Sequence, residues 1–124
     1  MEVYFDTNYP KNLAEALRLL HELDDTKHFN IIRTKNIENI DKENSVIFLF
    51  DKSKRGLDIA TDKHFEDGYK IFAFKLSSTD GINFFQLTLM TMKIWPKILN
   101  RIIEEAEPFV YTFNYNGRYL TKVR

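Results

Sequence analysis

The sequence predicts an α/β fold with a mostly parallel central sheet flanked by helices and with a C-terminal β-hairpin. Three observations support this prediction. Short apolar runs typical of buried strands alternate with segments of helical periodicity. Residues 45–76 have the pattern strand, helix, strand, which joins parallel neighbours in a sheet. Near the C-terminus, Asn116-Gly117 separates two alternating segments, which is typical of a tight hairpin turn.

The composition indicates one domain over residues 1–124. The chain has 124 residues, of which 44% are hydrophobic, and this content is enough to form one core. With only 4 glycines and 3 prolines, disorder is not expected. Lys plus Arg and Asp plus Glu are 18 each, so the net charge does not indicate a polyanionic partner. Any surface that binds nucleic acid must therefore be a local patch.

The sequence predicts a cytoplasmic protein without a membrane partner. Cysteine is absent, which excludes disulfides and thiolate ligands and fits a reducing compartment. The N-terminal region lacks the basic segment and apolar run of a secretory signal, and no stretch approaches the ~18 apolar residues of a membrane span. Motifs of nucleophilic catalysis, zinc binding and phosphate-binding glycine loops are also missing from the sequence.

The first strand is predicted from the apolar run at residues 3–5, which has no helical spacing. Asp6 and Asn8 follow it, and Pro10 suits the first turn of a helix. In open parallel sheets, ligands bind at this carboxyl edge. Asp6 and Asn8 are therefore candidate site residues. Capping of the following helix is an equally good interpretation of their position.

The next segments predict a helix, a strand and a polar connection. Residues 10–23 predict an amphipathic helix, because apolar side chains recur at steps of three and four: Leu13, Ala16, Leu17, Leu20 and Leu23. Residues 29–34 predict the second strand. The polar segment 35–45 indicates a loop or a short helical turn. Glu38 within it is a candidate third acid, although a solvated connection is the simpler interpretation.

A second apolar strand that ends in an acid is predicted over residues 45–51. Its continuous apolar run indicates burial on both faces. Asp51 ends the strand, and a basic loop over 52–56 follows. If this strand is a parallel neighbour of the first, Asp51 and Asp6 meet at one edge, where two carboxylates can hold Mg²⁺. The alternative is that Asp51 only starts a turn.

The second half of the chain predicts two further helices. Residues 57–67 predict a short helix that ends at Gly68, and 69–76 predict the next strand. The helix predicted over 82–106 has an apolar band too wide for one sheet face, and Pro96 is expected to kink or break it. A band of this kind is most often core, but its surplus width could mark a homodimer surface.

The predicted hairpin consists of residues 109–115 and 118–123, which alternate with period two. Its basic residues Arg118, Lys122 and Arg124 could contact nucleic acid. A half-exposed edge strand, which commonly carries charges, explains them as well.

The residues at the first strand also carry a resemblance to a known family. The strand ending in Asp6-Thr7-Asn8, followed by Pro10 and a Leu/Ala helix, resembles the opening of PIN and PIN-like domains. The strand that ends at Asp51, with the helix and the strand after it, is similar to the late strand of that superfamily. The resemblance implies a PIN-like three-layer sandwich over the whole chain, closest in spacing to the compact group with a long helix and a terminal hairpin.

The resemblance also implies an activity, a ribonuclease that depends on Mg²⁺ or Mn²⁺. Asp6 and Asp51 would hold the metal, and Asn8 would orient a water ligand at the catalytic site. The RNA backbone would be held by the three basic residues after Asp51: Lys52, Lys54 and Arg55. Domains of this superfamily often act as toxins paired with an antitoxin protein.

The chain departs from the family pattern in its acids. Members typically bring three or four acids together, and in many the late strand ends in Asp-x-Asp, where this chain has Ser53 at the second place. The neighbouring lysines could also neutralise the acids and displace a metal. The alternative function is therefore a catalytically degenerate PIN-like binding or oligomerisation module, such as a homodimer through the helix at 82–106. A generic Rossmann-like ligand binder is a third possibility.

Overall fold

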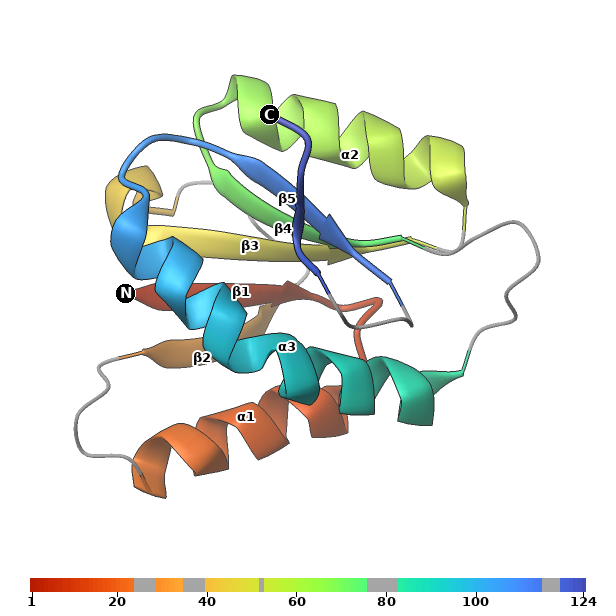
Figure 1. Cartoon of the computed structure of the whole chain (residues 1–124). Coiled ribbons are helices and arrows are strands. Elements are labelled where there is room, and N and C mark those ends of the chain that lie inside the picture. Colours follow the sequence, from red (N-terminus) through yellow and green to blue (C-terminus); the bar gives the residue numbers. More distant parts are fainter. Residues whose placement is uncertain (24–28, 35–39, 52, 76–82, 115–118) are drawn as a thin grey trace.

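The protein is an α/β structure with one six-stranded sheet and three helices. The computed structural model describes residues 1–23, 29–34, 40–51, 53–75, 83–114 and 119–124. The strands are β1 (Glu2–Asp6), β2 (Asn30–Thr34), β3 (Ser45–Phe50), β4 (Lys70–Phe74), β5 (Val110–Phe113) and β6 (Thr121–Lys122). The helices are α1 (Lys11–Leu23), α2 (Lys54–Glu66) and α3 (Phe84–Glu104) (Figure 1).

The sheet has the order β2-β1-β3-β4-β5-β6. Neighbouring strands are parallel except β5 and β6, which pair antiparallel. Helices α1 and α3 cover one face of the sheet, and α2 covers the other (Figure 1). The expected mostly parallel sheet between helices is thus confirmed, and so is the unit of β3, α2 and β4, whose two strands are parallel neighbours.

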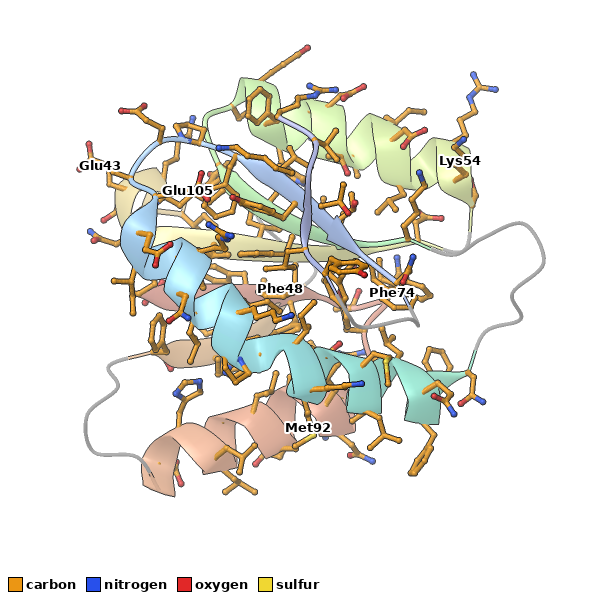
Figure 2. All side chains as sticks on the ribbon, in the orientation of Figure 1. Glu43, Phe48, Lys54, Phe74, Met92 and Glu105 are labelled. Atoms are coloured by element: carbon orange, nitrogen blue, oxygen red, sulfur yellow. The ribbon has the colours of Figure 1, made fainter. Side chains whose placement is uncertain are left out.

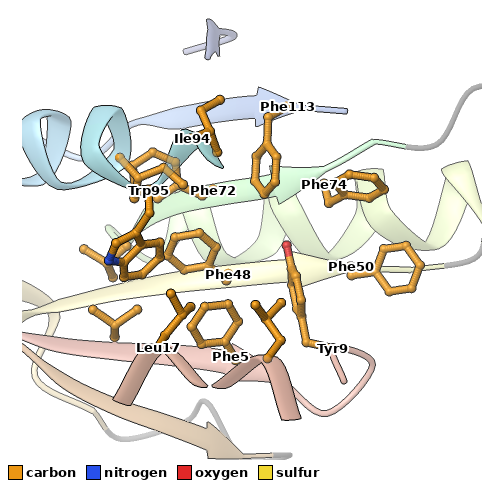
Figure 3. Close-up of a cluster of buried hydrophobic side chains, with 14 of the residues drawn as sticks. Phe5, Tyr9, Leu17, Phe48, Phe50, Phe72, Phe74, Ile94, Trp95 and Phe113 are labelled. Atoms are coloured by element: carbon orange, nitrogen blue, oxygen red, sulfur yellow. The ribbon is translucent and has the colours of Figure 1, made fainter. Parts of the chain in front are cut away.

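The larger core lies under α1 and α3 and is rich in aromatic rings. Phe48 of β3 stands near its centre, with its ring centroid 4.6 Å from that of Phe5 and 5.0 Å from that of Phe72. The ring of Trp95 on α3 lies 5.6 Å from the same centroid (Figure 3). Because such rings bury large apolar areas, this stack joins three strands to the helix above them.

Helix α2 begins earlier than the expected residue 57. Ser53 is its N-cap, and the Ser53 hydroxyl accepts a hydrogen bond of 2.9 Å from the Gly56 N–H. This bond satisfies one of the free amides of the first turn, so the helix includes Lys54. The expected end at Gly68 is confirmed, since Gly68 has a φ of +94° and its N–H donates to the Phe65 carbonyl.

Helix α3 runs without a break from Phe84 to Glu104, with Pro96 in its interior. Of the two expected effects of Pro96, a kink or a break, the break was therefore wrong. An interior proline costs about 3 kcal/mol of helix stability, but Trp95 and Ile98 beside it are buried in the core. The packing on both sides of Pro96 holds the helix together.

The C-terminal strands form a shorter antiparallel pair than expected. Tyr111 pairs with Lys122 and Thr112 with Thr121, while the Asn116-Gly117 turn lies outside the described residues, as does Arg118. The Lys122 ammonium lies 2.6 Å from Glu105, and the Arg124 guanidinium forms an ion pair with Asp62. These pairs favour the interpretation of Lys122 and Arg124 as edge-strand charges.

Other connections agree in part with the sequence. Within the polar connection, Lys42–Asn44 form a short 3₁₀ turn capped by Asp41, whereas residues 35–39, which include Glu38, lie outside the described residues. In the parts of the chain that the structure describes, no helix is long and apolar enough to cross a membrane.

Glu105 at the end of α3 holds the terminal pair of strands to the sheet. Its carboxylate accepts hydrogen bonds from the Tyr111 hydroxyl and from the Lys122 ammonium. Burial raises the pKa of Glu105, but these two bonds, together with the positive charges of Lys122 and Arg101, more than offset it and hold the pKa below its ordinary value. Burial and the bond to Glu105 raise the pKa of Tyr111, so this hydroxyl remains a donor.

We expect Glu105→Gln to lower the stability of the protein at pH 7 and to weaken its loss of stability in acid. A carboxyl whose pKa is lowered by folding stabilises the folded state above its unfolded pKa, about 4.3 for glutamate, and loses that contribution as the pH falls further. Urea midpoints at pH 7 and pH 3.5 measure the effect. Glu104→Gln, at a more exposed neighbour, is the control, and equal midpoints for Glu105→Gln and wild type at pH 7 would contradict the expectation.

Candidate functional site

The strand order reverses between β1 and β3, and the carboxyl ends of these two strands are the position at which open α/β sheets have their ligand crevice. From β1 the chain continues to α1 and β2 on one side, and from β3 it continues to α2 and β4 on the other. Such a reversal of direction marks the ligand site of open α/β sheets. Asp6 ends β1 and Asp51 directly follows β3. The expectation that both acids come to one edge of the sheet is therefore confirmed.

Both acids also belong to the same face of the sheet. Phe5 pairs with Phe48, so Asp6 stands level with Leu49, two positions before Asp51. Because side chains alternate along a strand, Asp6, Leu49 and Asp51 share the face that α2 covers. Both carboxylates are half-buried at this position.

The loop after β1 is fastened to the end of β3. The Asp6 carboxylate accepts a hydrogen bond of 3.1 Å from the Asn8 N–H, and the Asn8 side-chain amide donates to the Phe50 carbonyl over 2.9 Å. Among the described residues, no donor binds the Asn8 amide oxygen. Asn8 therefore links the two strand ends.

Tyr9 completes this loop as a buried residue beneath the site. Its hydroxyl lies 3.5 Å from the Leu49 carbonyl, and its ring packs against Phe5 and Phe48. Burial, and to a smaller extent the charge of Asp6, raise the pKa of Tyr9 well above its ordinary value. The phenol thus stays protonated and has a structural role.

Asp51 lies against the first turn of α2. Its carboxylate accepts a hydrogen bond of 2.8 Å from the Ser53 N–H. A Cβ at Gly56 would stand 2.7 Å from one Asp51 carboxylate oxygen and 2.9 Å from the other, so only glycine leaves this carboxylate in place. Asp51 therefore does start a turn, as the alternative interpretation held, and it also stands at the crevice.

Arg33 is a residue of this edge that the sequence reasoning missed. It lies on β2, and its guanidinium donates hydrogen bonds of 2.9 Å to the Tyr9 carbonyl and 2.6 Å to the Thr7 carbonyl. Arg33 thus braces the loop that carries Asn8. The only charged residue of β2, placed next to its carboxyl end, was the available signal.

The carboxyl edge is surrounded by exposed cations. Around Asp6 and Asp51 stand four residues that form no salt bridge within the described parts of the chain: Lys11, Lys54, Arg55 and Lys75. Lys54 and Arg55 are thus placed at the edge as expected, although on a helix instead of a loop, and Lys52 lies outside the described residues. Arg33 adds a fifth positive group.

The helices reinforce this positive character. All three begin at the carboxyl edge, and none has an acidic residue in its first turn. The Asp51 carboxylate lies at the positive end of the α2 dipole, whereas the positive ends of α1 and α3 have no acid in their first turns. Several acids lie at the opposite edge, where strands begin and helices end, as Figure 2 shows for Glu43 and Glu105. The others among the described residues are Glu2, Asp41, Glu66, Asp67, Glu104 and Glu107.

The oxygen atoms at the crevice fit a hard divalent cation with few protein ligands. The described residues contain no group of three or more His, Cys, Asp or Glu side chains placed to hold a metal. Two carboxylates and the Asn8 amide oxygen remain, and Mg²⁺ commonly takes one or two carboxylates and keeps several waters. These residues can therefore hold one such ion, while support for two is lacking within the described chain.

Comparison with known proteins adds no further assignment. No family model, no curated protein and no solved structure matches the chain. The site is therefore defined by its own geometry.

Proposed function

We propose that the protein is a PIN-like ribonuclease that depends on Mg²⁺ or Mn²⁺. The observation that supports this most directly is the pair Asp6 and Asp51 at the carboxyl ends of β1 and β3, on an edge that also carries exposed cations. Carboxylates attract the metal, and the cations around them attract a phosphate backbone. The presence of both carboxylates and cations at one edge fits a phosphodiester substrate.

The residues of the chain take distinct roles in this proposal. Asp6 and Asp51 hold the cation, and Asn8 orients a water ligand through its amide oxygen. Lys54 and Arg55 bind phosphate oxygens on the α2 side of the edge, together with Lys52. Mg²⁺ or Mn²⁺, when bound, would polarise the scissile phosphate and lower the pKa of water.

Arg33 acts as a positioning residue in this scheme. It fixes the carbonyls of Thr7 and Tyr9, and so it fixes the place of Asn8 over the end of β3.

A cytoplasmic location and a role as the toxin of a pair with an antitoxin protein belong to the same proposal.

We expect the wild-type protein to cleave single-stranded RNA in Mg²⁺ or Mn²⁺ and to lose this activity in EDTA. Asp6→Asn should reduce the rate about 100-fold or more, because it removes one of only two carboxylates while it keeps the shape of the side chain. A fluorophore-quencher RNA measures the rate. Glu104→Gln, at the opposite edge, is the matched control. Cleavage at an equal rate by Asp6→Asn would show that a contaminating nuclease causes it.

A second candidate function is the degenerate module that binds RNA without cutting it. It is favoured by the small number of acids and by the backbone amides that already occupy one oxygen of each carboxylate. In this case the wild-type protein binds RNA equally well in EDTA and in Mg²⁺, and neither metal produces cleavage.

A further inference from the structure

Two aromatic side chains at the start of α3 are exposed to solvent. Phe85 is 71% exposed and Phe84 is 48% exposed, whereas the later apolar residues Ile94, Ile98 and Ile102 of the same helix are buried. Phe84 and Phe85 are called the aromatic platform below. The wide apolar band of this helix is thus only partly core, since Leu89 and Ile103 are exposed as well, and Phe85 is its most exposed member.

The aromatic platform lies at the same end of the molecule as the acid pair. Helix α3 runs back along the sheet, so its first residue stands beyond the carboxyl ends of the strands (Figure 1). Lys54 lies at that end too, while Glu43 and Glu105 lie at the other (Figure 2). Lys75, the exposed residue directly after β4, lies at this end as well.

The charges near the platform favour a polyanion over a second copy of this chain. A two-fold interface through this end would bring Lys11, Lys54, Arg55 and Lys75 towards the same residues of the partner. Like charges brought together oppose association, whereas a phosphate backbone complements them. The N-terminal end of α3 also has no acid in its first turn, so its dipole adds to the attraction.

Proteins bind single-stranded nucleic acid with two kinds of group, exposed aromatic rings and cations. Phosphates bind the cations, and unpaired bases stack on the rings regardless of base identity. A duplex hides its base faces and cannot use such rings.

We propose that the aromatic platform is a base-stacking subsite, which holds unpaired nucleobases of a strand whose backbone crosses the carboxyl edge from α2 to α3. This inference rests on the proposed function for the identity of the strand as a substrate. The platform sets which part of an RNA is presented to Asp6 and Asp51, namely unpaired segments.

Binding can be measured separately from cleavage by anisotropy of a labelled oligouridine strand in EDTA, with wild type, Phe85→Ala and Phe85→Tyr. We expect Phe85→Ala to bind about 5- to 100-fold more weakly, the range for the loss of one stacked base, and Phe85→Tyr to bind as wild type does. Ile103→Ala, which removes another exposed apolar side chain of α3, is the control and should have no effect. An abasic strand of the same length isolates the phosphate contacts, and Phe85→Ala should not weaken its binding.

The outcomes separate this inference from the proposed function. Equal affinity of Phe85→Ala and wild type for oligouridine overturns the platform, even if cleavage is observed. Loss of oligouridine binding by Phe85→Ala in a protein that never cleaves RNA supports the platform and overturns the nuclease. Sedimentation that shows a wild-type dimer and a Phe85→Ala monomer overturns the platform, since the rings then serve self-association.

Discussion

Replacing Phe48 with alanine is expected to lower the free energy of unfolding by about 3–5 kcal/mol, the usual cost of deleting a buried aromatic ring. Phe48 is fully buried, and its ring contacts those of Phe5, Phe72 and Trp95. Its removal leaves a cavity between β3, which carries it, and the residues of β1, β4 and α3 that its ring contacts. Since domains of this size are stable by about 5–15 kcal/mol, the variant should retain a folded population with a much lower melting temperature.

Urea denaturation followed by circular dichroism measures this loss. Phe85→Ala is the matched control, because it deletes the same ring from an exposed position and should change stability by no more than about 0.5 kcal/mol. Equal losses for the two variants would contradict the packing described for the larger core.

The second large effect is expected for Asp51→Asn, which should reduce metal-dependent cleavage about 100-fold or more while the fold is preserved. The carboxylate stands at the crevice and is the only acid that β3 delivers to it. The amide oxygen of asparagine can still accept the hydrogen bond from the Ser53 N–H, so the turn and the start of α2 should persist. The loss of charge, and not of structure, is what the variant tests.

Gly56→Ala provides a sharper test of the same carboxylate. The added methyl group would collide with Asp51 and displace it, so cleavage should fall about 10- to 100-fold although no ligand is changed. Alanine is favoured over glycine inside a helix by about 0.5–1 kcal/mol, which offsets the strain of the displacement. Melting curves and cleavage rates of Gly56→Ala should therefore diverge. If the melting temperature and the cleavage rate fall together, glycine at position 56 is needed only for the stability of the fold.

Most of the fold could be predicted because its signals are local. The apolar runs before Asp6 and Asp51 predicted two buried neighbouring strands, and the parallel pairing of β1 with β3 confirmed that they meet at one edge. The helix α2 was predicted to begin at residue 57, although Ser53, a type of residue favoured at the N-cap, precedes its true start at Lys54 in the sequence. The break at Pro96 was wrong because local propensity was given more weight than burial of the residues beside it.

Several members of the site were predictable from the sequence, namely the two acids, Asn8, Lys54 and Arg55, but the contacts that hold them in place were not. The need for glycine at position 56 arises from the Asp51 carboxylate folded against it, and the bonds of Arg33 reach carbonyls more than twenty residues earlier in the chain. Neither relation leaves a periodic pattern in the sequence. The exposed state of Phe85 was hidden for a similar reason, since an aromatic residue in a helical pattern is expected to be core until the register of the helix on the sheet is known.

Four exposed cations, Lys11, Lys54, Arg55 and Lys75, lie at the carboxyl edge of this neutral chain and give that edge a positive character. A polyanion approaching in solution would be turned towards the positive edge before any contact forms, so the association rate should fall steeply as salt is added. The rings at the start of α3 carry no charge. If they hold the strand, the time that it stays bound should vary far less steeply with ionic strength than the association rate does. Capture and retention of a ligand would thus be governed by separate parts of the surface.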